Sequence, residues 1–261
     1  MERGIGADYS HRLRRLQLFS VSRHLKSVDR DELATFVAEN LPALTEDEAI
    51  AILDNPYVTP QICQQIAQNQ RLAAFYSVRL KLIALRQTPQ AIATKLAHYI
   101  YWPDLVRLSV EMTVSAPVRR AIDTVLLARV EKLTLGERIA SARRCSQALI
   151  KVFLFDPDPK VFAALLINQR LREDDLLQIA SSPQATPAKL VMIAADMKWS
   201  YRYAIRKALV LNPITPRATA ASQLRFLSRR DLIAIHRNPQ LSVYLRRCIE
   251  RLYEREREQI V

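Results

Sequence analysis

The residue types that most often carry enzyme chemistry are few in this sequence, and they are not grouped. Its four histidines are scattered, at His11, His24, His98 and His236. No two of them have the spacing of metal ligands on one face of a helix. The three cysteines also lie far apart, at Cys63, Cys145 and Cys248. Single cysteines of this kind are typical of reduced intracellular thiols. We therefore predict no catalytic residue and no metal site.

Adjacent acids occur in "TEDEAI" at Thr45–Ile50 and in "REDDLL" at Arg172–Leu177. Each pair comes just before an apolar run, where a carboxylate in the first turn of a helix is favoured by the helix dipole. Asp104 and Asp231 occupy a similar place. We interpret all of these acids as residues of helix starts.

Arginines form the one pattern that suggests binding. An apolar residue followed by Arg recurs at Val78-Arg79, Val118-Arg119, Ile205-Arg206 and Leu245-Arg246. At 100° per residue, these arginines lie at the flank of the buried face. Arg120, Lys207 and Arg247 follow further round, on the exposed side. The alternative is that the flank arginines cap helix carbonyls or cover apolar surface, and that the other three lie on a solvated face.

The net charge of +13 is unevenly spread along the chain. Residues 196–261 contain fourteen basic and six acidic side chains, whereas residues 31–77 contain one basic and seven acidic. A basic C-terminal part favours a polyanionic partner: nucleic acid, an anionic membrane surface or an acidic protein. No apolar run approaches the ~18–20 residues that a membrane span needs.

A long internal repeat organises these residues. When the chain is shifted by 127 residues, Asp54–Val130 aligns with Ser181–Arg257 without gaps, and 18 of 77 pairs are identical. The identities include the Thr-Pro pairs at 59 and 186 and at 88 and 215, and the Asp-Leu pairs at 104 and 231. Because they fall on residue types of helix boundaries and cores, we take the repeat as real.

A shorter period lies inside the long one. The apolar-Arg signatures, with Val161-Phe162 in the equivalent middle place, follow one another at steps of 40, 43, 44 and 40 residues. A further segment, "ELATFV" at Glu32–Val37, has the place of a degenerate first unit. A period in the low forties is typical of two-helix solenoid repeats. Only three glycines occur, which argues against β-hairpins and phosphate-binding loops. We predict an all-α array of about five to six two-helix repeats.

The recurring "NPITP" element predicts where helices stop and start. Thr is a good N-cap, and Pro suits the first helical position because it has no amide to lose there. A preceding Asn-Pro or Ser-Pro ends the previous helix, since Pro disfavours helical geometry in the residue before it. The longest helix candidate, Thr134–Phe155, lies where the two 127-residue halves join.

The motif set resembles HEAT-like superhelices, and more closely the leucine-rich-repeat-variant group of bacterial proteins. Members of that group show Asp-Pro-Asp-x-x-Val-Arg followed by Asn-Pro-x-Thr-Pro, which "DPDPKVFAALLIN" at Asp156–Asn168 and "YAIRKALVLNPITP" at Tyr203–Pro216 resemble. The resemblance implies a right-handed α-α superhelix of the HEAT/armadillo type, with the second helices on a concave wall. By analogy it implies a binding role.

This chain departs from those families in two respects. HEAT repeats often pair the Arg with an Asp six residues earlier, but Ala73, Thr113, Ser200 and Gln240 stand at those positions here. An Asp, Asp156, is present only where Phe162 replaces the Arg. The variant family is also associated with an N-terminal iron–sulfur cluster. Because this chain has no cysteine cluster, we expect no cofactor.

We expect residues 1–30 to be a basic N-terminal capping segment, although "SHRLRRLQLFSVSRHLKS" is also compatible with a targeting peptide. Residues 31–261 are predicted to be a single α-solenoid domain with two related halves, roughly 31–130 and 158–257. We find no signal of secretion, and a cytoplasmic location is the expectation.

Three functions fit these residues. The first is a non-catalytic adaptor that binds an acidic protein or peptide on its concave, partly basic face. The second is a nucleic-acid-binding superhelix that contacts the phosphate backbone. The third and weakest is an enzyme of the HEAT-like DNA glycosylase or lyase kind, for which Asp231 or Asp104 with Trp199 or Trp102 are the candidates. For either binding function, the predicted contact residues are Arg79, Arg119, Arg120, Arg206, Lys207, Arg246 and Arg247.

Overall fold

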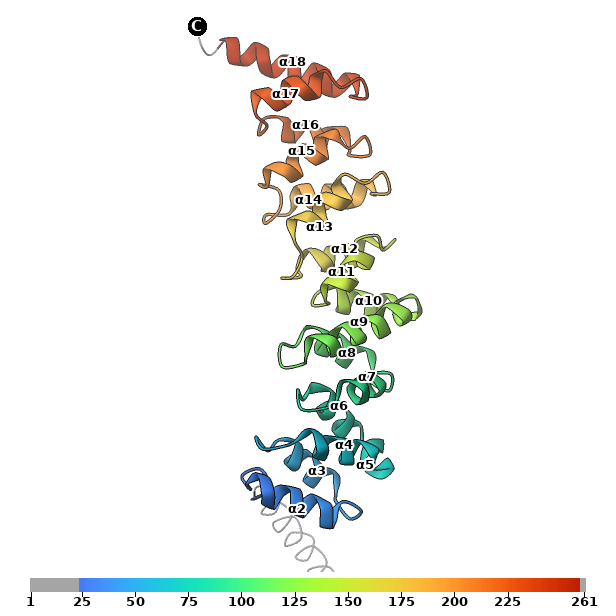
Figure 1. Ribbon diagram of the computed structural model, residues 1–261. Helices are drawn as coiled ribbons and strands as arrows, with labels where there is room; N and C mark the ends of the chain where they lie inside the picture. The colour runs from blue at the N-terminus through green and yellow to red at the C-terminus, as the bar shows by residue number, and fades with distance from the viewer. Residues whose placement is uncertain (1–23, 259–261) are drawn as a thin grey trace, which may run out of the picture. The chain divides into compact units, whose positions relative to one another are not determined.

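The computed structural model describes residues 24–258, and the side chains of residues 24–254. The predicted N-terminal cap therefore lies mostly outside the described residues. Within residues 24–258 the chain forms 17 α-helices and one short 3₁₀-helix, and no strand (Figure 1). The all-α prediction is confirmed for this part of the chain. No helix in it is long and apolar enough to cross a membrane.

The chain divides into two compact units, Met1–Ala128 (unit 1) and Arg129–Val261 (unit 2). The helices of unit 1 are α2 (Arg30–Asn40), α3 (Glu46–Leu53), α4 (Pro60–Gln68), α5 (Gln70–Ala74), α6 (Tyr76–Ala84), α7 (Gln90–Ala97), α8 (Trp102–Val110) and α9 (Ala116–Arg129), which ends at the boundary. Those of unit 2 are η1 (Val130–Lys132), α10 (Leu135–Ala142), α11 (Gln147–Phe153), α12 (Pro159–Leu166), α13 (Glu173–Ala180), α14 (Pro187–Ala195), α15 (Tyr203–Leu211), α16 (Arg217–Leu224), α17 (Arg229–His236) and α18 (Val243–Glu258).

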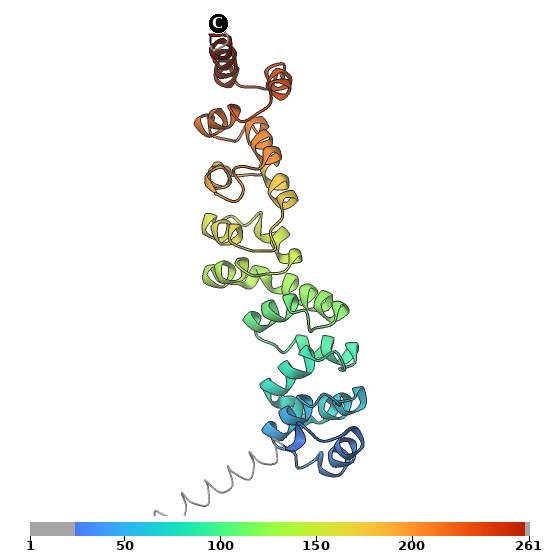
Figure 2. The same ribbon diagram turned by 90° about the vertical axis from the view of Figure 1, so that its left-hand side faces the viewer.

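Helices that are two apart in the sequence pack against each other in unit 2. α10 contacts α12, α12 contacts α14, α13 contacts α15, and α16 contacts α18. Figure 2 shows the result, in which successive helices of the unit fall into two columns. In unit 1 the segment around α6 is central, since α6 contacts α3, α4, α5 and α7.

The apolar anchors predicted from the sequence are all buried. Val78, Val161 and Ile205 are fully enclosed, and Val118 and Leu245 nearly so. One face of α9 is also buried, through Val118, Ile122, Val125 and Leu126. A helix with one apolar stripe must bury it against a neighbour. The spacing of apolar residues therefore fixes which side of each helix faces the core of its unit.

The 127-residue repeat reappears in the bounds of the helices. Adding 127 to Pro60–Gln68 (α4) gives Pro187–Ala195 (α14), and adding it to Tyr76–Ala84 (α6) gives Tyr203–Leu211 (α15). The same shift relates α3 to α13 and α7 to α16. An exception is the one-turn helix α5, at whose equivalent place unit 2 has a turn.

The prediction for the Thr-Pro pairs is right at two sites. Thr59 is the N-cap of α4, and its hydroxyl accepts a hydrogen bond from the amide of Ile62 at 3.3 Å. Thr186 caps α14 in the same way through Lys189 N at 3.4 Å. In both helices Pro fills the first position.

The same prediction is wrong at the other two pairs. α7 begins after Pro89 and α16 after Pro216, so the prolines are the N-cap residues. Both prolines have φ −54° and ψ 134°, a ψ that is not helical, which delays each helix by one residue. Thr88 and Thr215 are buried instead of capping.

The predicted long helix Thr134–Phe155 is also wrong, because it breaks into α10 and α11. At the break the side-chain NH₂ of Asn168 donates to the carbonyls of Ala142 and Cys145 at 2.9 and 3.4 Å. A freed carbonyl in the core needs such a partner, because leaving it unsatisfied costs ~1–3 kcal/mol.

Asn168 is one of three buried asparagines that link helices in this way. Asn55 donates to the carbonyls of Leu25 and Val28 at 2.8 and 2.9 Å. Asn212 donates to those of Ala180 and Ser182 at 2.7 and 3.1 Å. The amide oxygen of each accepts the backbone N–H two residues ahead, at 2.7–3.0 Å. Each side chain thus ties its own turn to a segment more than twenty residues earlier; we call these three residues the asparagine links.

A buried lysine makes a related connection. Lys189 is 2% exposed, and its Nζ donates to the carbonyl of Leu154 at the end of α11, at 2.8 Å. Burial lowers the pKa of this amine, an effect that the charge of Asp156 opposes. The ring of Phe162, 5.5 Å from Nζ, also faces the cation.

We predict that Asn168→Ala lowers the free energy of unfolding by about 2–4 kcal/mol, because two buried carbonyls lose their donors. The control is Asn238→Ala. Asn238 makes the same turn through Gln240 N, but no bond from its side-chain NH₂ reaches another described residue. Asn238→Ala should lower the free energy of unfolding by less than about 1 kcal/mol. Urea unfolding followed by circular dichroism gives both values, and equal losses would contradict the role of the links.

Candidate functional site

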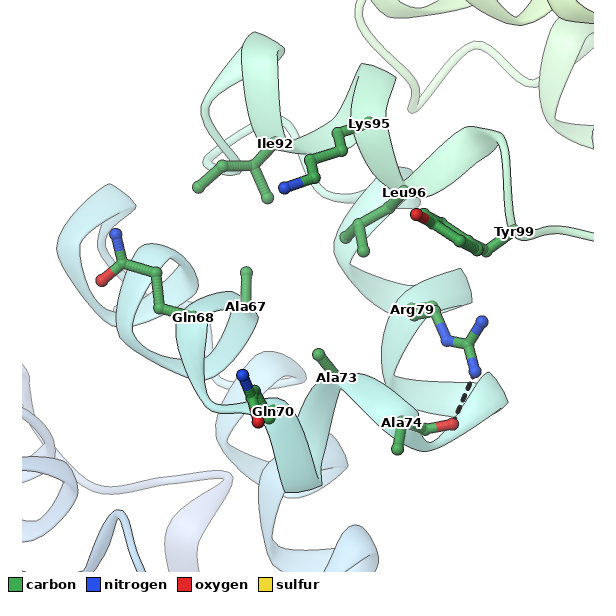
Figure 3. A pocket seen from close by; sticks show the side chains of 10 residues that line it. All are labelled: Ala67, Gln68, Gln70, Ala73, Ala74, Arg79, Ile92, Lys95, Leu96 and Tyr99. Atoms are coloured by element: carbon green, nitrogen blue, oxygen red, sulfur yellow. Dashed lines mark hydrogen bonds between the residues drawn. The ribbon is translucent and has the colours of Figure 1, made fainter.

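Unit 1 contains a groove of about 670 Å³ between α4, α5, α6 and α7 (Figure 3). Its lining residues are Ala67, Gln68, Gln70, Ala73, Ala74, Arg79, Ile92, Lys95, Leu96 and Tyr99. The volume lies within the range of small-ligand and peptide side-chain pockets. We call it the unit 1 groove.

The short helix α5 creates the space. Asn69 ends α4 and caps α5, its amide oxygen accepting the N–H groups of Arg71 and Leu72 at 3.1 and 3.2 Å. Its NH₂ group donates to the carbonyl of Leu41 at 3.2 Å, which fixes the turn on the helices before it. α5 then presents two small side chains, Ala73 and Ala74, to the groove. A groove remains because no large side chain fills this position.

The charge in the groove is positive. Arg79 and Lys95 both line it, and none of its lining residues is acidic. The Nη2 of Arg79 donates to the carbonyl of Ala74 at 2.6 Å, whereas its buried Nε has no hydrogen-bond partner among the described atoms. In Figure 3 the side chain of Lys95 extends to a point beside Ile92, at the upper edge of the groove. An apolar floor with two cations suits a ligand that is apolar and anionic.

Of the seven residues predicted from the sequence, Arg79 is the one that lines this groove. Arg79, Arg119, Arg206 and Arg246 are all half-buried, at the flank as expected. Three of them also bond to carbonyls of the preceding turn: Arg79 to Ala74, Arg206 to Ser200 at 2.5 Å and Arg246 to Asn238 at 3.3 Å. The capping alternative therefore describes these three side chains.

No Asp lies six residues before any of these four arginines, and backbone carbonyls accept the hydrogen bonds of three of them. Ser200, six residues before Arg206, offers its carbonyl oxygen where a HEAT repeat often has a carboxylate. Asp156 instead pairs with Arg138, Nη1 to Oδ2 at 2.6 Å, and its side chain is only 6% exposed. Arg119 reaches the sulfur of Met112 at 3.3 Å.

The surroundings differ among the three cations predicted to lie on the exposed side, which are Arg120, Lys207 and Arg247. Arg120 and Arg247 are exposed, and neither has an ion pair with a residue whose side chain the structure describes. Lys207 is half-buried and pairs with Asp231 at 2.8 Å. Arg206 and Lys207 lie together on α15, beside the turn that leads into α17.

A tyrosine–aspartate pair in each unit was missed by the sequence analysis. The hydroxyl of Tyr76 bonds to Asp104 at 2.6 Å, and that of Tyr203 bonds to Asp231. Each hydroxyl also accepts the N–H of the residue before α8 or α17, Tyr101 at 3.4 Å and Ser228 at 3.0 Å. The sequence does contain a signal of this pair, because the Tyr and the Asp are each identical at the two positions that the 127-residue shift relates.

These contacts change two pKa values. Burial and the hydrogen bond to Asp104 raise the pKa of Tyr76 to about 12. The hydrogen bonds from Lys207 and Tyr203 lower the pKa of Asp231 to about 2. At neutral pH Tyr76 is therefore neutral and Asp231 is charged. That suits a structural pair better than a proton-transferring one.

The residues considered for glycosylase chemistry are buried or engaged in hydrogen bonds. Trp102 and Trp199 are 8% and 3% exposed, so neither ring offers a free face for stacking. Asp104 and Asp231 are engaged by the tyrosines. No group of three potential metal ligands occurs within the described part of the chain.

Comparisons with known proteins found no match to this chain among protein-family models, curated proteins or solved structures.

We predict that the carboxyl group of Asp231 titrates with a midpoint of about 2, below its ordinary 3.8. A lowered pKa means that the contacts favour the charged form. Their stabilisation is complete above about pH 4 and is lost as the pH falls toward 2. Lys207→Met should raise the midpoint, whereas Lys198→Met, which removes a lysine that does not contact Asp231, should leave it unchanged. Carbon-13 NMR of the carboxyl group measures this, and a wild-type midpoint near 3.8 would contradict it.

Proposed function

We propose that this protein is a non-catalytic helical-repeat adaptor that binds an acidic, partly apolar peptide segment of a protein partner in the unit 1 groove. The repeated helix bounds and the packing of helices two apart support an α-solenoid of HEAT-like or leucine-rich-repeat-variant type, right-handed as in those families. The three free cysteines, two buried and one half-buried, favour a reducing compartment, the cytoplasm.

The observation that carries the proposal is the chemistry of the groove lining. Ala67, Ala73 and Leu96 offer an apolar floor, and Arg79 and Lys95 add two positive charges with no acid beside them. An apolar side chain of the partner would displace water from the floor. A neighbouring carboxylate would meet Lys95, whose Nζ has no hydrogen bond or ion pair with another described residue.

Gln68 and Gln70 add the means to bind a peptide backbone. Both are exposed residues at the groove, one at the end of α4 and the other at the start of α5. A side-chain amide has two donors and an acceptor, so it can pair with the N–H and C=O of an extended chain. The groove thus combines backbone pairing, apolar burial and charge selection within one unit.

The test begins with a random 12-residue peptide library displayed on phage and selected on the full chain. We expect enriched peptides to carry Asp or Glu next to a large apolar residue. With the best peptide labelled by fluorescein, Lys95→Glu should weaken binding at least about tenfold, because it reverses a charge that faces the ligand. The control, Arg30→Glu, makes the same charge change at an exposed position on α2, outside the groove, and should have less than about a twofold effect.

A second variant tests the groove without changing its charge. Ala74→Tyr introduces the residue that unit 2 carries at the equivalent position, Tyr201, and should place a large side chain in the groove, which Ala74 lines. We expect it to abolish peptide binding while thermal unfolding stays close to that of the wild type. Basic enriched peptides, or full affinity in both Lys95→Glu and Ala74→Tyr, would refute the proposal.

A further inference from the structure

Two surface turns of unit 2 carry cations stacked on aromatic rings. In the turn between α14 and α15, the guanidinium carbon of Arg202 lies 5.1 Å from the ring centre of Tyr201. In the turn after α16, Phe226 is contacted by two arginines, Arg206 at 3.8 Å and Arg225 at 4.6 Å. These five residues, Tyr201, Arg202, Arg206, Arg225 and Phe226, are called the arginine–aromatic patch.

The two turns are held together by hydrogen bonds. Arg206 donates from Nε to the carbonyl of Ser200, the residue before Tyr201, while its guanidinium stacks on Phe226 of the other turn. Tyr203 accepts the N–H of Ser228 at 3.0 Å, which joins the same turns a second time. The two turns are therefore held beside each other, and Arg206, which bonds to one turn and stacks on the other, is already ordered before a ligand binds.

The charge of the patch is not balanced. Arg206 and Arg225 share one ring, and neither has a carboxylate within ion-pair distance among the described residues. Asp231, which bonds to Tyr203 and Ser228 beside these turns, is already engaged by Lys207. Arg202 reaches Glu173 only at 3.8 Å, and more than a third of its side chain is exposed. Two like charges held this close repel each other, and an external anion would relieve that repulsion.

A hollow of about 210 Å³ continues the positive surface. It lies between α16 and α18, and its walls include Arg225 and a further arginine, Arg251. Its floor is formed by Leu224 and Leu252. Arg225 thus stands between the stacked ring of Phe226 and a hollow large enough for part of a ligand.

Open aromatic surface distinguishes the ligand class. Tyr201 is 56% exposed and Phe226 is 41% exposed, although each is already contacted by a guanidinium. An acidic peptide without apolar side chains would use the cations but not the exposed flat rings. A single-stranded nucleic acid uses both, because its phosphates meet arginines and its unpaired bases stack on aromatic side chains.

We propose that the arginine–aromatic patch of unit 2 binds single-stranded nucleic acid. Arg206 and Arg225 contact a phosphate, and Tyr201 stacks on a base. This site is separate from the unit 1 groove in the sequence and in its chemistry, so each proposal can fail without the other.

The test uses fluorescence anisotropy of the full chain with fluorescein-labelled 12-residue oligo(dT) and oligo(U) at ~50 mM salt. Arg225→Gln should weaken binding at least about fivefold and reduce the slope of log K against log salt by about 0.7, as expected for one lost phosphate contact. Tyr201→Leu should also weaken binding at least about fivefold, without changing that slope.

The controls match each change. Arg217→Gln removes an exposed arginine at the other end of α16, and Tyr57→Leu removes a tyrosine of similar exposure, 54%, from unit 1. Both should stay within about twofold of the wild type, and circular dichroism checks that every variant is folded. The proposal is overturned by absence of binding, by equal effects of Arg217→Gln and Arg225→Gln, or by full affinity in Tyr201→Leu. Equal binding of the matched duplex, or equal competition by polyglutamate, would overturn it as well.

Discussion

Both units depend on buried amide groups that satisfy carbonyls at the ends of earlier helices. Many short helices mean many helix ends, and each end leaves carbonyls without a partner in the helix. The asparagine links, Asn55, Asn168 and Asn212, solve this problem within the core, where water is excluded. Each uses both of its donors and its acceptor. The links therefore set the register between successive helices more strictly than apolar packing alone, which tolerates small shifts.

The two units share a plan but differ in the surface that it presents. Arg79 of unit 1 and Arg206 of unit 2 occupy equivalent positions, and each donates to a backbone carbonyl five or six residues earlier, Arg79 through Nη2 and Arg206 through Nε. Unit 1 has Ala74 where unit 2 has Tyr201, and α5 where unit 2 has a turn. These differences contribute to the groove of unit 1 and to the exposed aromatic surface of unit 2. A duplicated framework can thus carry two binding chemistries, because the residues that hold the helices are not the residues that face the solvent.

Much of the fold could be predicted from the sequence, because it depends on local patterns. Apolar spacing placed Val78 and Ile205 in the core, and Pro after Thr marked the starts of α4 and α14. The Thr-Pro pattern did not predict the start of α7 correctly, because it contains no information on the backbone ψ of Pro89, which is not helical. The asparagine links could not be predicted, because an amide side chain does not reveal which carbonyl, more than twenty residues earlier, it will reach. The unit 1 groove was equally hidden, since it depends on small residues and on the short helix α5.

The direction of the asparagine links bears on how the chain assembles. Every link runs backward: Asn55 reaches carbonyls 27 and 30 residues earlier, and Asn212 reaches carbonyls 30 and 32 residues earlier. During synthesis the acceptors of each link have therefore left the ribosome before its donor appears. Domains generally form from the N-terminus as the chain emerges. The turns of Asn55, Asn168 and Asn212 can accordingly form in the order of translation, each bonded to a segment that has already been synthesised.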